Sequence, residues 1–302
     1  MKSMTLAGRL LAALFIAGNM LASPAYAAPK VVKEYRSLYR NITVVENPPQ
    51  RCVRLENKKN PYNSQSCLVL NNPQELLFFY SQAMFAVLST LDDGLSVLSV
   101  GLGGGTMPTA LHDYFSKVDV TTVEIDPKML EAAKDYMFFA EGPRNEVVIQ
   151  DARFFIRKQG QKGAQYDVVM LDAFNGEYIP EHLTTQEFLQ EVKKVLKPGG
   201  LLLSNTFSYK DFYHSESVTY ESVFPDFCML RSAGARTIVA YNGKACDAAK
   251  LRKDVAGNLD KLKTYIPFPG FLPETISSEK NWDPTARLFT DQFSPANLYN
   301  TH

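Results

Sequence analysis

The chain has 302 residues, enough for one large domain or two small ones, and its hydrophobic content of 45% is ordinary for a protein with an apolar core. Its 32 lysines and arginines balance its 32 aspartates and glutamates. This balance excludes a strong long-range attraction to nucleic acid or to an anionic membrane, so we expect no nucleic-acid partner.

The first residues have the pattern of a secretory signal. Lys2 and Arg9 flank the start of an apolar stretch over residues 10–17, and Ala25-Tyr26-Ala27 offers the small side chains that a signal peptidase selects. The apolar stretch is too short for a good membrane span, although an uncleaved anchor is the alternative. We therefore expect a signal peptide over residues 1–27, no stable membrane anchor, and a periplasmic or secreted protein.

Four cysteines, an even number, fit two disulfide bonds in an exported protein, and they allow three pairings. We favour Cys52–Cys67 and Cys228–Cys246, because the members of each pair lie on or beside neighbouring strand-like segments. No metal site is expected, since the sequence has no Cys-x-x-Cys motif and no histidine cluster. We expect each histidine at the surface or in the core: His112, His182, His214 and His302.

Residues 28–72 are expected to form a small β-rich cap. Their alternating apolar residues predict strands over 34–46, 51–55 and 67–70, with a turn at residues 47–49. Pro73 then opens a predicted helix that runs through Leu91, because apolar residues recur at helical spacing.

Strands and helices alternate after this cap, which predicts an α/β domain over residues 73–262. The expected strands are 97–100, 118–123, 147–150, 166–171, 201–204, 228–231 and 237–241. The expected helices are 109–115, 126–139 and 185–196, and the last is stopped by Lys197-Pro198-Gly199-Gly200. We predict a Rossmann-like, doubly wound and mostly parallel sheet, with an irregular tail over residues 263–302 that packs on it.

A glycine turn follows the first strand of this domain. Gly101, Gly103 and Gly105 would let the backbone approach a ligand where a Cβ atom would clash. The dinucleotide pattern would need glycine in place of Thr106, so the spacing fits a single nucleoside better than a pyrophosphate. Glu124 ends the next strand and could accept hydrogen bonds from both hydroxyls of a ribose. The alternative is a turn that is merely tight.

Three separate strands end in an acid: Glu124, Asp151 and Asp172. In a parallel α/β sheet the ligand lies beyond the carboxyl ends of the strands. Any one of these acids could instead cap a helix, as Asp126 is expected to do. Three of them at one edge of the sheet are better explained by a shared binding site.

These motifs, in this order, carry a resemblance. They are the glycine turn and residues 39–47, 123–127, 151–153, 166–172 and 196–200. Together they resemble the class I S-adenosylmethionine-dependent transferase fold and, within it, the spermidine synthase (polyamine aminopropyltransferase) family. The resemblance covers residues 35–241.

The resemblance implies roles by position. Asp172 would face the reacting amine and would form the catalytic set with Tyr80. Glu124 would hold the ribose, and Asp151 with Ala152 would contact the adenine edge. The whole set implied for binding the nucleoside is Gln65, Gly101, Gly103, Gly105, Glu124, Asp151 and Ala152.

The chain departs from active aminopropyltransferases at three places. Gly104 stands where their glycine loop has an aspartate that would bind the aminopropyl amine. Ser81 breaks their Tyr-His-Glu or Tyr-Gln-Glu motif. Asn175 stands where a second aspartate would accept the amine proton, and an amide cannot act as a general base. In their place, residues 172–183 and 288–291 resemble the spermidine-synthase-like branch of the family.

A diamine substrate is a dication, so its channel would need carboxylates, and tyrosine rings could enclose its alkyl chain. The residues expected to contact the substrate are Asn175, Glu177, Tyr178 and Asp291. The alternative for Glu177, and for Glu181 nearby, is a solvated loop.

The expected function is therefore a spermidine synthase-like transferase that uses S-adenosylmethionine or its decarboxylated form. Aminopropyl transfer to a polyamine is the default that the resemblance implies, and Gly104 leaves methyl transfer open. A non-catalytic periplasmic protein that binds polyamines or nucleosides is the main alternative, and Thr106 weakens a third, an NAD-dependent oxidoreductase. The partner would be a small-molecule amine, and the resemblance allows a homodimer.

Overall fold

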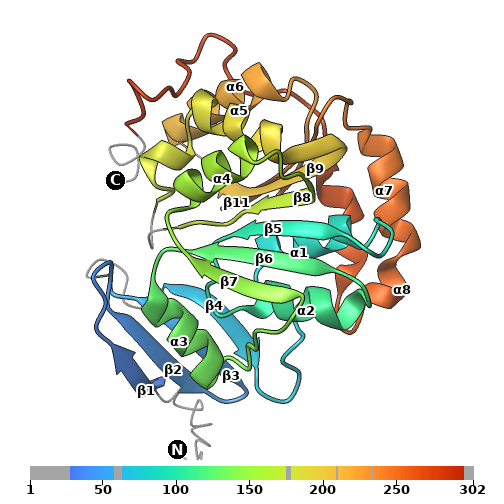
Figure 1. Cartoon of the computed structure of the whole chain (residues 1–302). Helices are drawn as coiled ribbons and strands as arrows, with labels where there is room; N and C mark the ends of the chain where they lie inside the picture. The colour runs from blue at the N-terminus through green and yellow to red at the C-terminus, as the bar shows by residue number, and fades with distance from the viewer. Residues whose placement is uncertain (1–27, 58–62, 175–177, 209, 233, 296–302) are drawn as a thin grey trace, which may run out of the picture.

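The computed structural model describes residues 28–57, 63–174, 178–208, 210–232 and 234–295. The expected signal peptide, Asn175 and Glu177 lie outside these described residues. Among the helices in the described ranges, not one is both long enough and apolar enough to cross a membrane. Figure 1 shows a small sheet near the N-terminus beside a larger α/β unit.

The small sheet is antiparallel, with its four strands in chain order. The strands are β1 (Lys30–Tyr35), β2 (Ile42–Asn47), β3 (Gln50–Leu55) and β4 (Ser64–Val69). The single strand expected over residues 34–46 is wrong: it is two strands. They are separated by a turn in which the Ser37 hydroxyl accepts a hydrogen bond from the Tyr39 N–H at 3.0 Å, a local bond that interrupts strand pairing.

The main sheet has eight strands in the order β12-β10-β11-β9-β8-β5-β6-β7. Neighbours from β7 to β9 pair in parallel, and the remaining pairs are antiparallel. The chain moves outward from β5 to β7 and returns to the other side of β5 with β8, so the strand order reverses between β5 and β8. The bounds are β5 (Ser96–Val100), β6 (Asp119–Glu124), β7 (Asn145–Ile149), β8 (Tyr166–Leu171), β9 (Leu196–Phe207), β10 (Cys228–Arg231), β11 (Ala235–Tyr241) and β12 (Ile276–Ser277).

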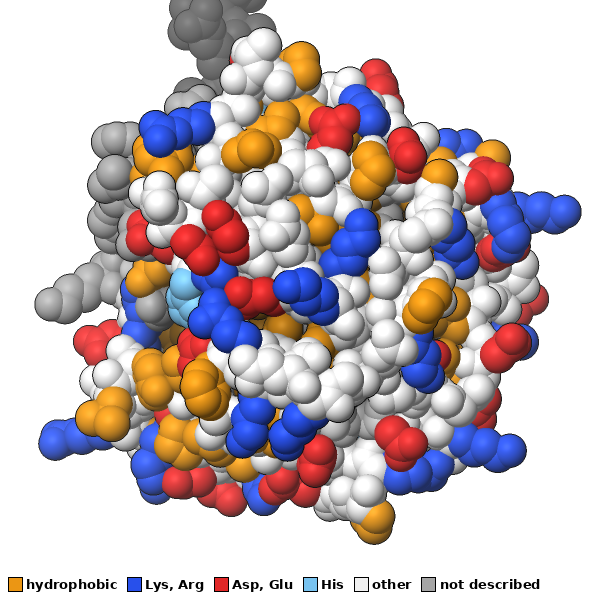
Figure 2. Space-filling model, turned by 45° about the horizontal axis from the view of Figure 1, so that its top comes forward, with side chains coloured by type: hydrophobic (Ala, Val, Ile, Leu, Met, Phe, Trp, Pro, Cys, Tyr) orange, Lys and Arg blue, Asp and Glu red, His pale blue; other side chains and the backbone are white. Residues whose placement is uncertain are grey.

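Helices cover both faces of this sheet (Figure 1). Val168 belongs to one apolar core and Val169 to the other, since successive side chains of a strand point to opposite faces. That is why the central strands are nearly continuous apolar runs. The helices are α1 (Phe79–Leu88), α2 (Thr106–Tyr114), α3 (Pro127–Tyr136), α4 (Ala152–Gln161), α5 (Gln186–Val195), α6 (Lys210–Val223), α7 (Ala248–Gly257) and α8 (Leu259–Leu262). The face in Figure 2 carries acidic and basic side chains intermixed, with no large area of one sign.

The helix expected from Pro73 begins later, at Phe79 in α1, and α2 begins at Thr106 rather than at residue 109. The strand expected over residues 201–204 is longer: β9 includes the Lys-Pro-Gly-Gly segment after α5. The tail expected to be irregular contributes β12, which pairs with β10.

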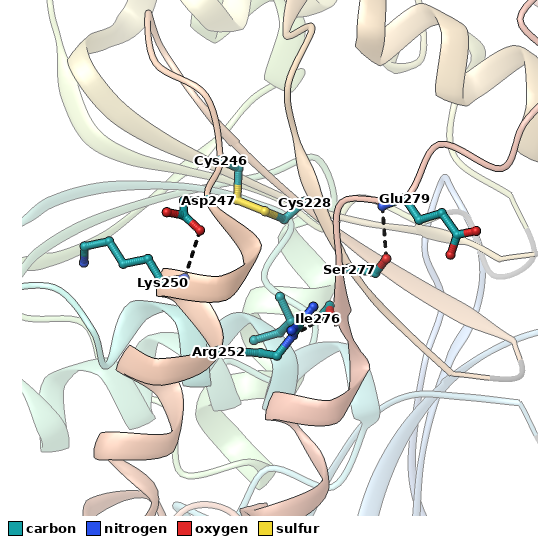
Figure 3. Close-up of a disulfide and its surroundings, with 8 residues drawn as sticks. All are labelled: Cys228, Cys246, Asp247, Lys250, Arg252, Ile276, Ser277 and Glu279. Atoms are coloured by element: carbon teal, nitrogen blue, oxygen red, sulfur yellow. Dashed lines mark hydrogen bonds between the residues drawn. A yellow bond between two sulfur atoms is a disulfide. The ribbon is translucent and has the colours of Figure 1, made fainter.

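Both expected disulfide bonds are present. Cys52–Cys67 joins the directly paired strands β3 and β4. Cys228–Cys246 joins β10 to the segment that precedes α7, as Figure 3 shows. Beside it, the Arg252 guanidinium donates to the Ile276 carbonyl at 3.1 Å. The disulfide and this bond together connect β10, α7 and the tail.

Candidate active site

A cavity of about 620 Å³ lies at the carboxyl ends of the parallel strands. Its described lining includes the ends of β5, β6 and β8, where the strand order reverses. Residues 64–66 of β4 also line it, so the small sheet closes one side. This is the edge at which doubly wound sheets bind ligands, and the volume is typical of small-molecule sites.

The glycine turn after β5 depends on contacts within the protein. Gly101 has a φ of +96°, and a Cβ atom there would lie 2.3 Å from the carbonyl oxygen of Asp172. Gly105 caps α2 with a φ of +72°, and a Cβ there would lie 2.5 Å from the Phe139 ring. Gly101 and Gly103 line the cavity, but Gly105 is not among its lining residues. The expected reason for Gly105 is therefore corrected: it allows a turn to pack on Phe139.

Glu124 is held rigidly at the cavity wall by backbone groups. Its Oε2 accepts from the Leu102 N–H at 3.0 Å, and its Oε1 accepts from the Asp126 N–H at 2.9 Å. Burial raises the pKa of Glu124, although these N–H bonds oppose the rise. The carboxylate keeps lone pairs that can accept further hydrogen bonds from a ligand.

Asp151 has two roles. Its Oδ1 accepts from the Phe154 N–H at 2.8 Å and so caps α4, which is the alternative considered for such acids. Asp151, Ala152 and His182 also line the cavity. The Nε2 of His182 lies 2.9 Å from Asp151 Oδ2, within hydrogen-bond distance. His182 is exposed, in agreement with the surface expectation, but its place at the cavity was not expected.

Asp172 follows β8 and lines the same cavity as Glu124 and Asp151. Burial raises the pKa of Asp172 to about 7, against hydrogen bonds from Asn205 and Tyr80 that favour the ionised form. The Asn205 side-chain amide donates to Asp172 Oδ1 at 2.9 Å. Burial, and then the neighbouring Asp172 carboxylate, raise the pKa of the Tyr80 hydroxyl well above its usual range, so Tyr80 remains a donor. With a pKa of about 7, the Asp172 carboxylate can accept a proton near neutral pH.

Two of the expected substrate residues, Asp291 and Tyr178, are not among the described residues that line the cavity. Asp291 is not among the lining residues: its two carboxylate oxygens accept from Arg153 at 2.6 and 2.7 Å, and one also accepts from Thr185 at 2.8 Å. The expectation that Asp291 contacts the substrate is therefore corrected. Tyr178 is half-buried and is likewise absent from the described lining, whereas Gln65 and Tyr80 are part of it.

The sequence interpretation gave several cavity residues no role at the site. Asn205 follows the apolar residues 201–203 in β9, beside the strand that precedes Asp172, so the strand-end rule could have identified it. Phe207 ends the same strand. His182 lies in a short 3₁₀ helix that follows β8 in the chain, and no local pattern indicates its position.

The chain combines a Rossmann-like α/β sheet, a glycine turn and three acids around one cavity, which is the arrangement of a Rossmann-like transferase fold. Residues 77–237 match the spermine/spermidine synthase domain, and a polyamine aminopropyltransferase of Vibrio vulnificus is 37% identical over 272 residues, 89% of this chain and 91% of the relative. The chain belongs to the spermine/spermidine synthase family. The crystal structure of a probable spermidine synthase from Corynebacterium glutamicum shares the fold, with a TM-score of 0.64 at 20% identity over 76% of this chain and 88% of that one.

Methyltransferases are also similar. The eEF1A lysine and N-terminal methyltransferase of Bos taurus is 36% identical over 154 residues, which are 48% of this chain and 22% of that protein. Human methyltransferase-like protein 13, solved in complex with SAH, has a TM-score of 0.56 at 26% identity and covers 69% of this chain and 97% of that one. By these relationships the chain is a transferase.

Proposed function

We propose that this protein binds an S-adenosylmethionine-type nucleoside and transfers an alkyl group from it to an amine. One observation carries the proposal: Glu124, Asp151 and Asp172, from three different strand ends, line one cavity beside the Gly101 turn. Two similar structures add support: human methyltransferase-like protein 13 was solved in complex with SAH, and a spermidine synthase that shares the fold was solved in complex with the transition-state analogue AdoDATO.

The residues at one end of the cavity suit a nucleoside. Two backbone N–H groups hold the Glu124 carboxylate in one orientation. The carboxylate would therefore be preorganised to accept hydrogen bonds from a ribose, which lowers the entropic cost of binding. Asp151 and Ala152 begin α4 at the neighbouring strand end, where the adenine would lie. His182, bonded to Asp151, would fix the orientation of that carboxylate.

The other end of the cavity suits the reacting amine. The bound donor would supply an activated carbon, so that a nitrogen–carbon bond forms as the carbon–sulfur bond breaks, a thioether leaves, and the nitrogen loses a proton. Asp172 would take that proton on its carboxylate. Tyr80 and Asn205 would hold the carboxylate in place. This gives Asp172 the role that Asn175 cannot fill.

Aminopropyl transfer is the first candidate, because the Vibrio vulnificus relative that matches most of the chain is a polyamine aminopropyltransferase. Methyl transfer is the second, and one contact favours it. A Cβ atom at Gly104 would lie 2.7 Å from the Ser66 hydroxyl and 2.9 Å from the end of Met137. An aspartate at this position, which would bind an aminopropyl amine, would therefore require the Ser66 and Met137 side chains to move.

Calorimetry and product analysis would test the proposal. The purified chain would be titrated with S-adenosylmethionine, its decarboxylated form and methylthioadenosine, and then incubated with each donor and a panel of amines. We expect nucleoside binding, and a product whose mass identifies the transferred group. Binding of polyamines without any nucleoside would instead support a non-catalytic binding protein, and binding of neither would refute the proposal.

We also propose that the chain is exported and cleaved after Ala27. The two disulfide bonds support this, because such bonds persist in oxidising compartments. Mass spectrometry of the protein from a periplasmic fraction should give Ala28 as the first residue. A full-length chain in the cytosolic fraction would contradict the proposal.

A further inference from the structure

We propose that Phe78 is a positioning residue for the transfer: its ring holds the Tyr80 side chain in the orientation in which the Tyr80 hydroxyl donates to Asp172. The inference rests on the proposed function and adds to it a residue that is not among the described residues lining the cavity. Phe78 comes directly before α1, and Ser81 in the first turn of that helix is one of the three departures from active aminopropyltransferases.

The rings of Phe78 and Tyr80 are stacked. Their centroids are 5.9 Å apart and their planes differ by 9°, which is a favourable arrangement for two aromatic side chains. Tyr80 lines the cavity and its hydroxyl donates to the Asp172 carboxylate, whereas Phe78 packs on the tyrosine ring itself. A ring packed on one face restricts the rotation of the tyrosine side chain, and this rotation decides where the hydroxyl lies.

The stacking of these two rings depends on the late start of α1. Phe78 is the N-cap residue and has an extended backbone, with φ of −95° and ψ of 142°, and the helix begins at Phe79. Residues two apart within a helix do not face each other, so a helix that began at Pro73 would turn the two rings to different sides. Because Phe78 lies outside the helix, its ring can pack on Tyr80.

Polar side chains in the first turn of α1 fix this start. The Ser81 hydroxyl donates to the Phe78 carbonyl at 2.8 Å, and the Gln82 side-chain amide donates to the Leu76 carbonyl at 2.7 Å. The Leu76 N–H donates to the Tyr265 carbonyl at 2.8 Å, which ties the segment before the helix to the C-terminal part of the chain. Ser81 and Gln82, which replace the second and third residues of the family motif, therefore hold the backbone that places the Phe78 ring.

The small sheet anchors the Phe78 ring. Phe78 is half-buried and packs against a cluster formed by Val45, Cys52 and Cys67. The two cysteines are joined by a disulfide bond and lie directly opposite each other on the paired strands β3 and β4. The contact therefore connects a covalently closed part of the small sheet to the tyrosine that donates to Asp172.

A misplaced Tyr80 hydroxyl would change the pKa of Asp172. Donation from Tyr80 on α1 and from Asn205 on β9 favours the ionised carboxylate, against the effect of burial. Loss of the Tyr80 bond alone should therefore raise this pKa and move the inflection of kcat to higher pH. The other ionisable side chains in the described lining would remain as they are: Arg40, Glu124, Asp126, Asp151 and His182.

Removal of the Phe78 ring tests the proposal. Phe78→Leu and Phe78→Met each keep an apolar side chain of similar bulk on the small sheet. With the donor and amine that the wild type turns over, each should shift the inflection of kcat upward by roughly 0.5–1 pH unit, a two- to fivefold loss at pH 7 that is recovered in alkaline buffer. Phe78→Tyr keeps the ring and should behave as the wild type does. The affinity for methylthioadenosine should not change in these variants.

Phe79→Leu is the matched control. Phe79 is the next residue in the chain and is likewise half-buried, but its ring packs on Phe271, with centroids 6.1 Å apart. It is not among the described residues that line the cavity. The control should therefore keep the wild-type pH profile. Thermal unfolding of every variant would confirm that it is folded.

A second background separates positioning from general damage. Tyr80→Phe removes the hydroxyl itself, so Phe78→Leu should cause no further shift in that background. Titration of the Asp172 carboxyl by isotope-edited NMR would measure the same change in pKa without turnover. This titration would be made on the wild type, on Phe78→Leu and on Phe79→Leu.

The outcomes separate this inference from the proposed function. An upward shift that Phe78→Leu and Phe78→Met share, and that Phe78→Tyr and Phe79→Leu lack, would support the inference. An unchanged pKa of Asp172, an equal loss of kcat at every pH, or a further shift of the same size in the Tyr80→Phe background would overturn it and leave the proposed function standing. Absence of nucleoside binding and of transfer in the wild type would overturn the proposed function, and the NMR titration would then still decide whether Phe78 positions Tyr80.

Discussion

Asn205 donates its side-chain amide to the carboxylate of Asp172 at 2.9 Å, across the neighbouring parallel strands β9 and β8. This bond favours the ionised carboxylate, whereas burial of Asp172 favours the protonated one, and burial is the larger effect. The pKa of about 7 that results is well suited to a general base at neutral pH. Two predictions follow from the pair.

Transfer should depend on pH through Asp172. Because the raised pKa keeps this carboxyl protonated below about pH 7, and only the ionised form accepts a proton, kcat should rise as pH rises through about 7. Asp172→Asn should lower kcat by roughly 10²–10⁴-fold and remove this inflection. Asp119→Asn, an exposed position at the start of β6, is the control. Unchanged turnover in Asp172→Asn would exclude it as the base.

Asn205→Ala should shift the pH profile upward. The variant removes a bond that lowers the pKa of Asp172, so the carboxyl should stay protonated to a higher pH. Turnover should then be reduced at pH 7 and recover in more alkaline buffer. A variant that merely loosened the fold would lose activity at every pH. The measurement is kcat against pH for both proteins, and coincident inflections would contradict the assigned role.

Glu124→Ala should weaken nucleoside binding. The variant removes the carboxylate proposed to accept from the ribose, and it leaves the N–H groups of Leu102 and Asp126 without this partner. Bonds to a charged group of this kind correspond to a loss of roughly 10–100-fold in affinity. Glu146→Ala, an exposed residue on β7, is the matched control. Calorimetry with methylthioadenosine measures both, and equal affinities would show that Glu124 does not hold the ribose.

The sequence was a good guide to the sheet and its strand ends. The nearly continuous apolar runs of the central strands identify them, because each strand is buried on both faces. The rule that ligands lie at the carboxyl ends of the strands then places Glu124, Asp151 and Asp172 together, as the structure confirms. Both disulfide pairings are also confirmed, since each joins or adjoins neighbouring strands.

Contacts between distant segments were not predictable in the same way. In the sequence, Asp291 was expected to be available to bind a cation. Its partner Arg153 lies 138 residues earlier, and no sequence pattern connects the two residues. His182 contacts Asp151 from a short 3₁₀ helix that follows β8 in the chain. Its position therefore depends on the path of the segment between β8 and this helix. Pro73 satisfied a rule for helix starts, but α1 begins only at Phe79.

Asp291→Asn should lower stability without changing substrate binding. Its hydrogen bonds with Arg153 depress the pKa of Asp291, so the ion pair stabilises the fold at neutral pH and is lost as pH falls below about 4. Because the Asp291 side chain is 41% exposed, we expect a loss of only about 1 kcal/mol in the free energy of unfolding at pH 7. Wild type and variant should converge in acid. An altered KM for the amine, with stability unchanged, would restore Asp291 to the substrate site.

Removal of the Cys228–Cys246 bond should destabilise the C-terminal part of the chain. The bond closes a loop between residues 18 apart in sequence, and loss of a disulfide of this kind costs about 2–4 kcal/mol. It also holds β10 beside α7, and β10 pairs with the short strand β12, whose Ile276 carbonyl accepts from Arg252 (Figure 3). In the double variant Cys228→Ala/Cys246→Ala, we therefore expect hydrogen exchange to become faster than in the wild type. The increase should be larger in α7 and β12 than in β5 and β6.

The other disulfide provides a matched comparison, and hydrogen exchange and denaturant unfolding would be measured for both variants. The variant Cys52→Ala/Cys67→Ala removes the bond within the small sheet instead, so its increase in exchange should be confined to β3 and β4. Both variants should respond less to a reductant than the wild type, because each has one bond left to reduce. If the Cys228→Ala/Cys246→Ala variant unfolded at the same denaturant concentration as the wild type, the link between β10 and α7 would contribute nothing, and the tail would have to be held by its own packing.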